Sequence, residues 1–388
     1  MKTINQIKIE NKSILMRVDY NVPIVDGVIT NTFRIDSSFE TIKYCLKNNC
    51  KVTLMSHLGR PKKSNLKDSL RPVFEYLKGV FQDKVFFSDD CISDDAIKKS
   101  QQMNQREIHL LENLRFHQEE LSCDKVFSKK LSKHGEIFIN DAFGTAHRAH
   151  ASNVGVPNFF NQKACGFLVS KEVKYLRQIT NNKTGKLIIL LGGAKISDKI
   201  KLISRFEDIA DKILIGGAMS NNFLKAQNLN LGKSLIESDC IDLAKEILIR
   251  NRDTIVLPLD FMCATNISDD KNTRVSSYDD IGDNELTVDI GPETISSFKH
   301  IIKEADCVIW NGPMGIIEKE KFSLGTKEII NLIKEVTADG GTSIIGGGDT
   351  SSIINYNDFD KFSHISTGGG ASLKLLGREN MPAFEALR

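Results

Sequence analysis

The chain has 388 residues, which exceeds the usual size of one hydrophobic core and indicates two domains. Its 52 basic and 50 acidic side chains give a formal net charge of +2, so overall charge favours neither nucleic acid nor an anionic membrane as the main partner. Any anion binding must come from local clusters.

The eight cysteines are dispersed, with no C-x-x-C pair and no histidine at zinc-finger spacing. We interpret them as free thiols in a reducing cytoplasm. The segment Met1–Val18 lacks the apolar core of a signal peptide. No apolar run approaches the roughly 18 residues that span a bilayer, so we expect a cytoplasmic protein.

Short β-rich runs that end in turn residues alternate with amphipathic helical stretches in the first half, which is typical of a parallel sheet with crossover helices. The predicted strands are Ile14–Val18, Val52–Ser56, Val85–Phe87, Ile108–Glu112 and Ile137–Asn140, and the predicted helices include Ile35–Leu46 and Val73–Val80.

A break follows near Gly166, where Lys171–Thr180 predicts one connecting helix and Asn181–Gly185 a turn-rich stop. The alternating pattern then resumes without a repeated sequence motif. The sequence therefore predicts an α/β protein with two similar-sized, doubly wound parallel-sheet (Rossmann-like) domains. The second set of predicted strands is Leu187–Leu191, Lys212–Ile215, Thr254–Pro258, Val308–Trp310 and Thr342–Ile345, with helices such as Ser197–Ile209 and Glu293–Glu304.

Cationic residues follow predicted strand ends or begin helices in the first half. Ligands of open parallel sheets bind beyond the carboxyl ends of the strands, and an arginine fork matches phosphate or carboxylate oxygens two at a time. We therefore expect a clamp for a small anionic metabolite, although a surface ion pair is the alternative for any single arginine. The arginines are Arg34, Arg60, Arg115 and Arg148, with His57 and His150 as further donors and Asp19 and Asn21 to orient the ligand.

Glycine pairs and triplets follow strands in the second half, where backbone N–H groups can approach phosphates. Gly192-Gly193 precedes Lys195 and Lys199, which are four apart and predicted to share a helix face, so both could reach one phosphate chain. Two solvated lysines are the alternative. Neither a P-loop nor a dinucleotide fingerprint is present in the sequence.

The segment Gly346–Thr350 suggests a second contact with a nucleotide. Its glycines admit phosphates, Thr350 can donate a hydrogen bond and Asp349 can hold Mg²⁺, but a tight turn with a capping aspartate is equally compatible. Glu318 could accept hydrogen bonds from ribose, or it could be an exposed loop residue. Trp310, the only tryptophan, is expected to pack in the core.

The sequence offers no Ser-His-Asp order, reactive-cysteine signature or close carboxylate dyad. Phosphoryl transfer between anionic partners needs none of these, because it depends on alignment and on cations that offset charge. A carboxylate acceptor would not need a general base either.

These residues resemble the phosphoglycerate kinase family along essentially the whole chain. The resemblance implies reversible transfer of the acyl phosphate of 1,3-bisphosphoglycerate to ADP, giving 3-phosphoglycerate and ATP with Mg²⁺, by a monomer whose domains close. The matching stretches are Arg17–Pro23, Ser56–Pro61, Leu111–Phe116, Asn140–Ser152 and the glycine motifs of the second half.

The resemblance also implies a role for individual residues. It places Arg34, Lys195 and Lys199 at the transferring group and the backbone of Gly369 and Gly370 at the transition state. Residues implied to bind phosphoglycerate are Asp19, Asn21, Arg34, His57, Arg60, Arg115 and Arg148. Those implied to bind the nucleotide are Gly192, Gly193, Lys195, Lys199, Gly216, Gly217, Asn311, Glu318, Gly346, Gly347, Gly348, Asp349 and Thr350, with Asp349 on the magnesium.

The implied domains are a phosphoglycerate-binding domain (1–168), a helix and hinge (169–185), a nucleotide-binding domain (186–370) and a C-terminal segment (371–388) that packs back on the first domain. Ser220–Asn222, Lys374 and Gly377 depart from the family pattern, which affects nucleotide preference and the hinge. The alternatives are a nucleotide-linked dehydrogenase, opposed by the missing fingerprint, and a non-catalytic anion- or RNA-binding protein, opposed by the near-neutral charge and the lack of aromatic stacking motifs.

Overall fold

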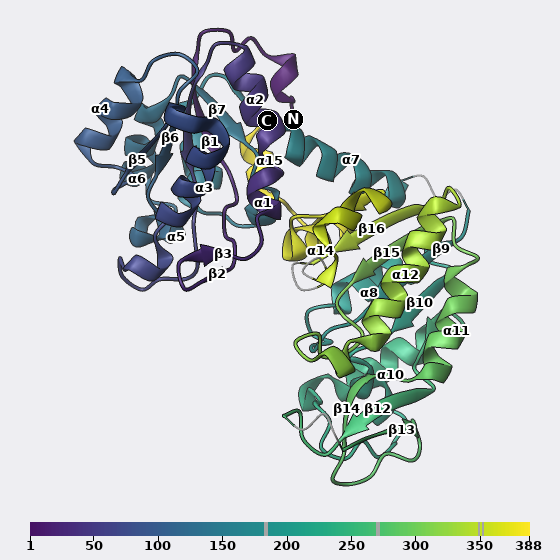
Figure 1. Cartoon of the computed structure of the whole chain (residues 1–388). Helices are drawn as coiled ribbons and strands as arrows, with labels where there is room; N and C mark the ends of the chain where they lie inside the picture. The colour runs from purple at the N-terminus through teal and green to yellow at the C-terminus, as the bar shows by residue number, and fades with distance from the viewer. Residues whose placement is uncertain (182–184, 269–271, 348–349, 351–352) are drawn as a thin grey trace. The chain divides into compact units, whose positions relative to one another are not determined.

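The chain divides into two compact units in the computed structural model, which describes residues 1–181, 185–268, 272–347, 350 and 353–388 (Figure 1). The N-terminal unit comprises Met1–Lys174 and Glu379–Arg388, and the C-terminal unit comprises Tyr175–Arg378. Helix α7 (Phe167–Asn181) contains the boundary at Lys174. Each unit contains its own parallel sheet of six strands.

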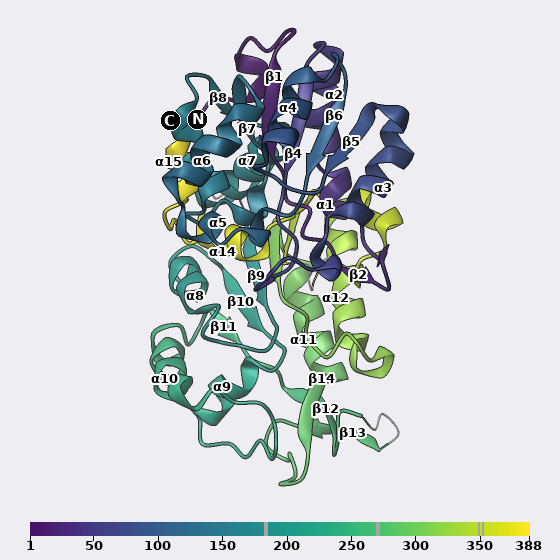
Figure 2. The same ribbon diagram turned by 90° about the vertical axis from the view of Figure 1, so that its left-hand side faces the viewer.

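The N-terminal sheet has the strand order β5-β6-β4-β1-β7-β8, and every pairing is parallel (Figure 2). The five predicted strands are confirmed within a residue or two at each end. The short edge strand β8 was not predicted, because three residues carry too little periodic pattern. The bounds are β1 Ser13–Arg17, β4 Lys51–Met55, β5 Val85–Ser88, β6 Ile108–Leu111, β7 Ile137–Asn140 and β8 Lys163–Cys165, with a hairpin of β2 (Ile24–Val25) and β3 (Val28–Ile29).

One predicted helix of this unit is divided in the structure. The expectation of one helix over Ile35–Leu46 is wrong, because the chain forms two helices separated by Ser37 and Ser38. These hydroxyls donate to the Phe33 and Ile35 carbonyls at 2.6 and 2.7 Å, and such side-chain bonds compete with a regular helix. The bounds are α1 Phe33–Asp36, α2 Phe39–Lys47, α3 Arg71–Phe81, α4 Asp94–Gln102, α5 Glu119–Ser122, α6 Lys125–Leu131 and α15 Pro382–Ala386.

The end of the chain packs in the N-terminal unit through α15. The Ala383 amide donates to the Ala146 carbonyl at 3.2 Å, and the Phe384 and Phe143 rings stack with centroids 6.5 Å apart. Only the residues from Glu379 onward belong to this unit. Residues 371–378 of the predicted C-terminal segment instead belong to the C-terminal unit, where α14 (Gly369–Leu376) packs against α8 and β16.

The C-terminal sheet has the order β11-β10-β9-β15-β16-β17, again all parallel. A separate antiparallel sheet, β13-β12-β14, was not predicted. The bounds are β9 Leu187–Leu191, β10 Lys212–Ile215, β11 Ile255–Val256, β12 Asp260–Ala264, β13 Thr273–Ser277, β14 Leu286–Ile290, β15 Cys307–Asn311, β16 Thr342–Gly346 and β17 His364–Ile365. The main helices are α8 Ile200–Phe206, α9 Ser220–Lys225, α10 Ile241–Arg250, α11 Pro292–Ile302 and α12 Leu324–Ala338.

Helix α8 begins three residues later than the predicted start at Ser197. Lys199 is its N-cap and Lys195 precedes it, so the expectation that the two lysines share a helix face is wrong. Ser197 lies in the loop before the helix, where Glu237 accepts hydrogen bonds from both its amide and its hydroxyl.

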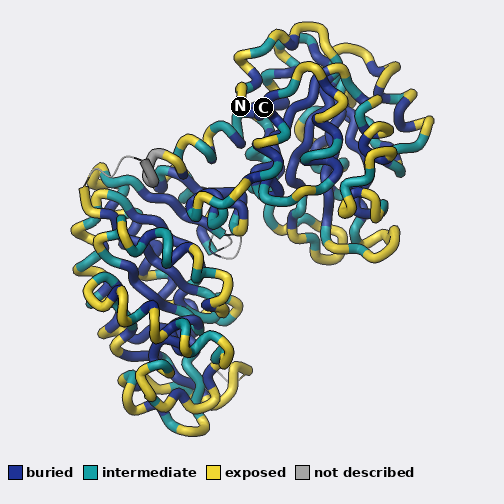
Figure 3. Tube along the Cα trace, turned by 180° about the vertical axis from the view of Figure 1, so that it is seen from behind, coloured by how far each residue is buried: buried dark blue, intermediate teal, exposed yellow. Residues whose placement is uncertain are grey.

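The cores lie along the two sheets, whose strands are the buried part of each unit in Figure 3. Trp310 is fully buried on β15 and its indole Nε1 donates to the Gly312 carbonyl at 2.8 Å, which confirms its expected place in the core. Among the described residues, no helix combines the length and apolarity needed to cross a bilayer.

Candidate functional site

The predicted anion-binding residues of the N-terminal unit follow the carboxyl ends of four neighbouring strands, β6, β4, β1 and β7. Parallel strands end at the same edge, so the loops after them meet there. Asp19 and Asn21 follow β1, and His57 and Arg60 follow β4. Arg115 lies in the short helical turn η4 (Leu114–Phe116) after β6, and Arg148 follows β7.

Asp19 is the central acidic residue of this edge. Its Oδ2 lies 3.6 Å from Arg34 Nη1, and its Oδ1 lies 3.8 Å from His57 Nδ1. Arg34 Nη1 also donates to the Asn21 carbonyl at 2.9 Å. The structure thus brings four of the predicted residues, Asp19, Asn21, Arg34 and His57, into one group.

Hydrogen bonds between side chains and the backbone of the loop after β4 hold that loop against this group. The Gly59 amide donates to Asn21 Oδ1 at 2.8 Å, and Arg115 Nη1 donates to the Gly59 carbonyl. Asn113 fixes the same loop, because it accepts from the Leu58 amide at 3.1 Å and donates to the Leu58 carbonyl at 2.7 Å. Arg115 is therefore positioned beside the loop that contains His57.

The cluster carries more positive charge than its acidic residues offset. Burial, followed by Arg148 and Arg17, lowers the pKa of Arg115 to about 10. Burial, with Arg60 and Arg34 as neighbours, also lowers the pKa of Arg148, and burial together with Arg115 lowers that of His150 to about 4. Arg60 is exposed but contributes to both arginine shifts. Such a positive potential favours an anion.

His57 is a neutral donor within this positive field. Burial, with Arg17 and Arg115 as the next causes, holds its pKa well below the usual value. Arg17 Nη2 lies 3.2 Å from His57 Nδ1 and can only donate, so the ring proton is on Nε2. That Nε2 is buried and has no hydrogen-bond partner among the described residues. The same is true of Arg115 Nε. Both N–H groups are available to a ligand.

The sequence interpretation missed the network that supports the cluster. Arg17 is fully buried and its Nε donates to Ser152 Oγ at 2.8 Å; Ser152 in turn donates from both its hydroxyl and its amide to the buried Glu120. Arg17 belongs to the motif that contains Asp19, which was its only sequence signal. Nothing in the local sequence indicated that Glu120 and Ser152 would join it.

The glycine loops of the C-terminal unit meet at the carboxyl edge of its own sheet. The Gly192 amide donates to the Asn311 carbonyl at 3.0 Å, the Gly193 amide to Pro313 at 2.8 Å and the Gly217 amide to Met314 at 3.1 Å. These contacts need glycine, because a Cβ at Gly312 would lie 2.2 Å from the Gly192 carbonyl oxygen. The loops after β9, β10 and β15 therefore form one surface.

Asn311 lies at the centre of that surface. Its Oδ1 accepts from Lys199 Nζ, whereas its buried Nδ2 has no partner among the described residues. A Cβ at Gly346 or Gly347 would lie 3.0 or 3.3 Å from that Nδ2. The loop after β16 therefore joins the other three, and it is held by Thr350 Oγ1, which accepts from the Gly312 amide at 2.8 Å.

The other predicted nucleotide residues lie on the flanking loops and at the start of α14. Lys195 is exposed before α8, and Glu318 is exposed in the loop after β15. Gly369 and Gly370 begin α14, whose Ser372 Cβ would lie 4.0 Å from a Cβ at Gly346. Gly348 and the predicted magnesium ligand Asp349 lie outside the described residues.

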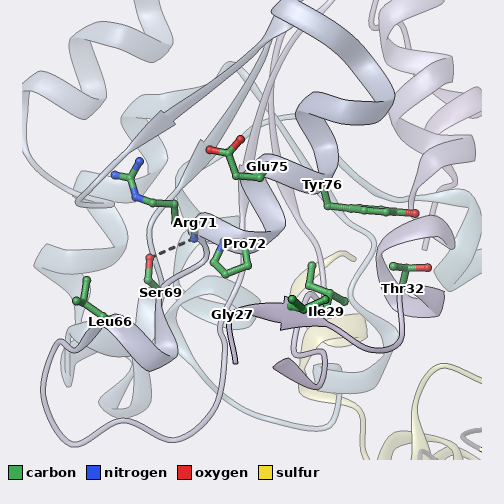
Figure 4. A pocket seen from close by; sticks show the side chains of 10 residues that line it. Gly27, Ile29, Thr32, Leu66, Ser69, Arg71, Pro72, Glu75 and Tyr76 are labelled. Atoms are coloured by element: carbon green, nitrogen blue, oxygen red, sulfur yellow. Dashed lines mark hydrogen bonds between the residues drawn. The ribbon is translucent and has the colours of Figure 1, made fainter. Parts of the chain in front are cut away.

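A separate pocket of about 580 Å³ lies between the β2–β3 hairpin and the start of α3. Figure 4 shows Pro72 and Ile29 between Arg71 on one side and Tyr76 on the other. None of the predicted site residues lines it, so it is distinct from the cationic cluster.

Comparisons with known proteins give one consistent result. Residues 4–379 match the family model described as phosphoglycerate kinase. A phosphoglycerate kinase of Finegoldia magna is 45% identical over 393 aligned residues, covering 100% of this chain and 98% of that protein, and one of Thermosipho africanus is 44% identical, covering 99% and 97%. The structure of phosphoglycerate kinase from Coxiella burnetii matches with a TM-score of 0.85, 33% identity and coverage of 99% and 98%; the corresponding values for that from Pyrococcus horikoshii OT3 are 0.89, 30%, 100% and 98%.

Proposed function

The chain belongs to the phosphoglycerate kinase family, and on that basis we propose how its residues divide the work between two units. The protein is a glycolytic phosphotransferase with a carboxyl group as acceptor. Its reaction transfers the acyl phosphate of 1,3-bisphosphoglycerate to ADP and runs in reverse from ATP and 3-phosphoglycerate.

The N-terminal cluster binds the phosphoglycerate. The observation that carries this assignment is the excess positive charge at the sheet edge, where the neutral His57 presents a buried Nε2–H among arginines of lowered pKa. Arg60, Arg115 and Arg148 bind phosphate oxygens, and Asp19 and Asn21 orient the hydroxyl and carboxylate groups.

The loops around Asn311 bind the nucleotide phosphates. Asn311 Nδ2 is a buried donor without a partner among the described residues, and Lys199 contacts the same side chain. The amide and hydroxyl groups around Asn311 suit phosphate oxygens, whereas a hard cation needs oxygen ligands such as those of Asp349 and of the phosphates themselves. Mg²⁺ at that position would offset the phosphate charge.

The transfer itself needs little covalent chemistry from the chain. In the ATP-consuming direction a carboxylate oxygen of 3-phosphoglycerate forms a bond to the γ-phosphorus as the bond to the ADP oxygen breaks. The acceptor is already ionised, so no base removes a proton. Arg34 from one unit and Lys195 and Lys199 from the other offset the charge on the transferring group, with the Gly369 and Gly370 amides as further donors.

This division of residues requires the two units to close around the substrates. Closure would also exclude water, to which an acyl phosphate is vulnerable. We propose a monomer in the cytoplasm, which is consistent with the eight cysteines, all of them described and none in a disulfide.

A coupled assay tests the assigned reaction. The complete mixture contains the purified chain, ATP, Mg²⁺ and 3-phosphoglycerate, and each component is then omitted in turn. ADP should form only in the complete mixture. ADP formation that persists without 3-phosphoglycerate would refute the assigned acceptor.

A further inference from the structure

A group of three potential metal ligands lies in the N-terminal unit, on the loops after two neighbouring strands. Asp90 and Cys91 follow β5, and His117 follows β6 and the turn η4. One ligand atom from each, a carboxylate oxygen, the thiol sulfur and an imidazole nitrogen, lies within 4.8 Å of the other two. None of the three belongs to the set that we assign to either substrate.

The carboxylate and the imidazole form a hydrogen bond that is slightly shorter than the spacing of two ligands of one ion, so a bound ion would replace that hydrogen bond and move the two atoms slightly apart. Asp90 Oδ2 is 3.1 Å from His117 Nε2. A tetrahedral ion with bonds of about 2.0–2.3 Å separates its ligands by roughly 3.3–3.7 Å. For the Cys91 sulfur to bind the same ion, it must therefore move by no more than roughly 1–1.5 Å relative to the other two ligand atoms.

Contacts outside the trio hold each of these groups in place. Asp90 Oδ1 accepts from the Ile92 and Ser93 amides at 2.6 and 2.7 Å, which leaves Oδ2 directed at His117. The His117 ring packs against Phe127 with centroids 5.4 Å apart. His134 contacts the Cys91 carbonyl at 3.0 Å and fixes the backbone that bears the thiol. Ligand orientation by outer contacts of this kind is a common property of metal sites.

Access to the trio is one-sided. The Cys91 residue is 1% exposed, whereas the Asp90 and His117 side chains are 40% and 23% exposed. An ion would enter past the carboxylate and imidazole and meet the thiol at the inner wall.

We propose that Asp90, Cys91 and His117 form a binding site for a thiophilic divalent cation of the Zn²⁺ class. A mixed sulfur, nitrogen and oxygen set favours such an ion over the hard Mg²⁺ of the nucleotide. On binding, the thiol releases its proton to solvent, the neutral imidazole binds through Nε2 with its single proton on Nδ1, and a water molecule fills the fourth position. The ion changes no oxidation state.

Cobalt provides a direct test, because a thiolate bound to Co²⁺ absorbs in the near ultraviolet. Untagged full-length protein, freed of nucleotide and metals, is titrated with Co²⁺. We expect one equivalent to produce the sulfur-to-cobalt band, and Zn²⁺ to abolish it by displacement.

Three variants locate the site. Cys91→Ser should abolish the band, whereas Asp90→Asn and His117→Gln, which keep the thiol and change partly exposed side chains, should weaken Co²⁺ binding at least tenfold. The matched control is Cys240→Ser, which removes a partly exposed thiol of the other unit and should leave the band unchanged. Circular dichroism confirms that each variant is folded.

Three results would overturn the proposal. The first is an unchanged band in folded Cys91→Ser, and the second is unchanged Co²⁺ affinity in both other variants. The third is the absence of a band in the unmodified chain at millimolar Co²⁺.

Discussion

His57 combines burial with the absence of charge, and both properties follow from its neighbours. Arg17 occupies its Nδ1, and surrounding arginines make a second positive charge costly. A neutral ring with its proton on Nε2 can donate to an anion throughout the physiological pH range. The arginines then attract the anion by their charge, and His57 donates a hydrogen bond of fixed direction to it.

Arg34 is the residue whose removal should affect turnover most selectively. It is held by Asp19 and the Asn21 carbonyl in the N-terminal unit, and we assign it to the transferring phosphoryl group. Arg34→Ala should lower kcat by about 10²–10³-fold, because loss of one transition-state donor costs about 2.7–4 kcal/mol. The Kd for ADP should change less than twofold.

The control for this variant is Arg71→Ala, which removes an exposed arginine of the same unit that is paired with Asp89. Its kcat should be unchanged. Steady-state kinetics and ADP titration measure both variants, and normal turnover in Arg34→Ala would disprove the assigned role.

The sequence identified the residues that face the ligand better than the fully buried residues that support them. Asp19 and His57 follow strand ends directly, so the fold rule for parallel sheets predicted their meeting, whereas Arg34 was indicated only by its place at the start of a predicted helix. Glu120 and Ser152 reach Arg17 through tertiary packing, which no spacing reveals. The prediction that Lys195 and Lys199 share a helix face failed because α8 begins only at Ile200, after a loop in which Ser197 is bonded to Glu237.

The loops between strands and helices in the C-terminal unit depend on close backbone contact. Gly312 and Gly340 both have φ of 95°, but a Cβ at Gly312 would lie 2.2 Å from a carbonyl oxygen, whereas a Cβ at Gly340 would meet nothing within 4 Å. Backbone strain at this φ should lower the unfolding free energy of both alanine variants by about 1–2 kcal/mol. Gly312→Ala should lose roughly a further 1–3 kcal/mol from the forced displacement.

Urea unfolding followed by the fluorescence of Trp310, which contacts the Gly312 carbonyl, measures both variants. Equal losses of unfolding free energy in Gly312→Ala and Gly340→Ala would show that close approach of the loops is unimportant.

Asp141 links β7 to the start of α7 and makes the N-terminal unit sensitive to pH. Its Oδ1 accepts from the Val169 amide at 3.2 Å, but burial raises its pKa to about 7. The unfolded value is about 3.9, so the folded state holds the proton more tightly. This contribution to stability is complete below about pH 4 and is lost as the pH rises towards 7, by up to about 1.4 kcal/mol per pH unit.

Asp141→Asn should therefore flatten the pH dependence of N-terminal stability between pH 5 and 7. Hydrogen exchange of peptides from that unit measures the effect, with Asp83→Asn, an exposed aspartate of the same unit, as control. A slope unchanged by Asp141→Asn would refute the link.

The elements that sequence predicted best are the long central strands, whose continuous apolar runs are buried on both faces. The antiparallel sheet β13-β12-β14 was missed because its strands have mixed patterns: β13 is largely exposed and β12 begins with the buried Asp260. The Asp260 carboxylate accepts from the Thr294 amide at the start of α11, a tertiary contact that a local pattern does not contain.

Each of the two units binds one substrate in the function that we propose. The sequence predicted two similar parallel-sheet folds because the strand–helix rhythm occurs twice, and both sheets are found. The position at which the last residues leave the C-terminal unit could not be read from the sequence pattern, because α14 and α15 are both short and their pattern does not say which unit each packs against.

The most direct test of this division is calorimetric titration of the intact chain with 3-phosphoglycerate and with ADP. Arg148→Ala should weaken 3-phosphoglycerate binding about 10–100-fold, which corresponds to the loss of a charge-assisted hydrogen bond, and leave the Kd for ADP within about twofold. Lys199→Ala should do the reverse. If either variant weakened the binding of both ligands equally, or of only the ligand assigned to the other unit, the assignment of one substrate to each unit would be wrong.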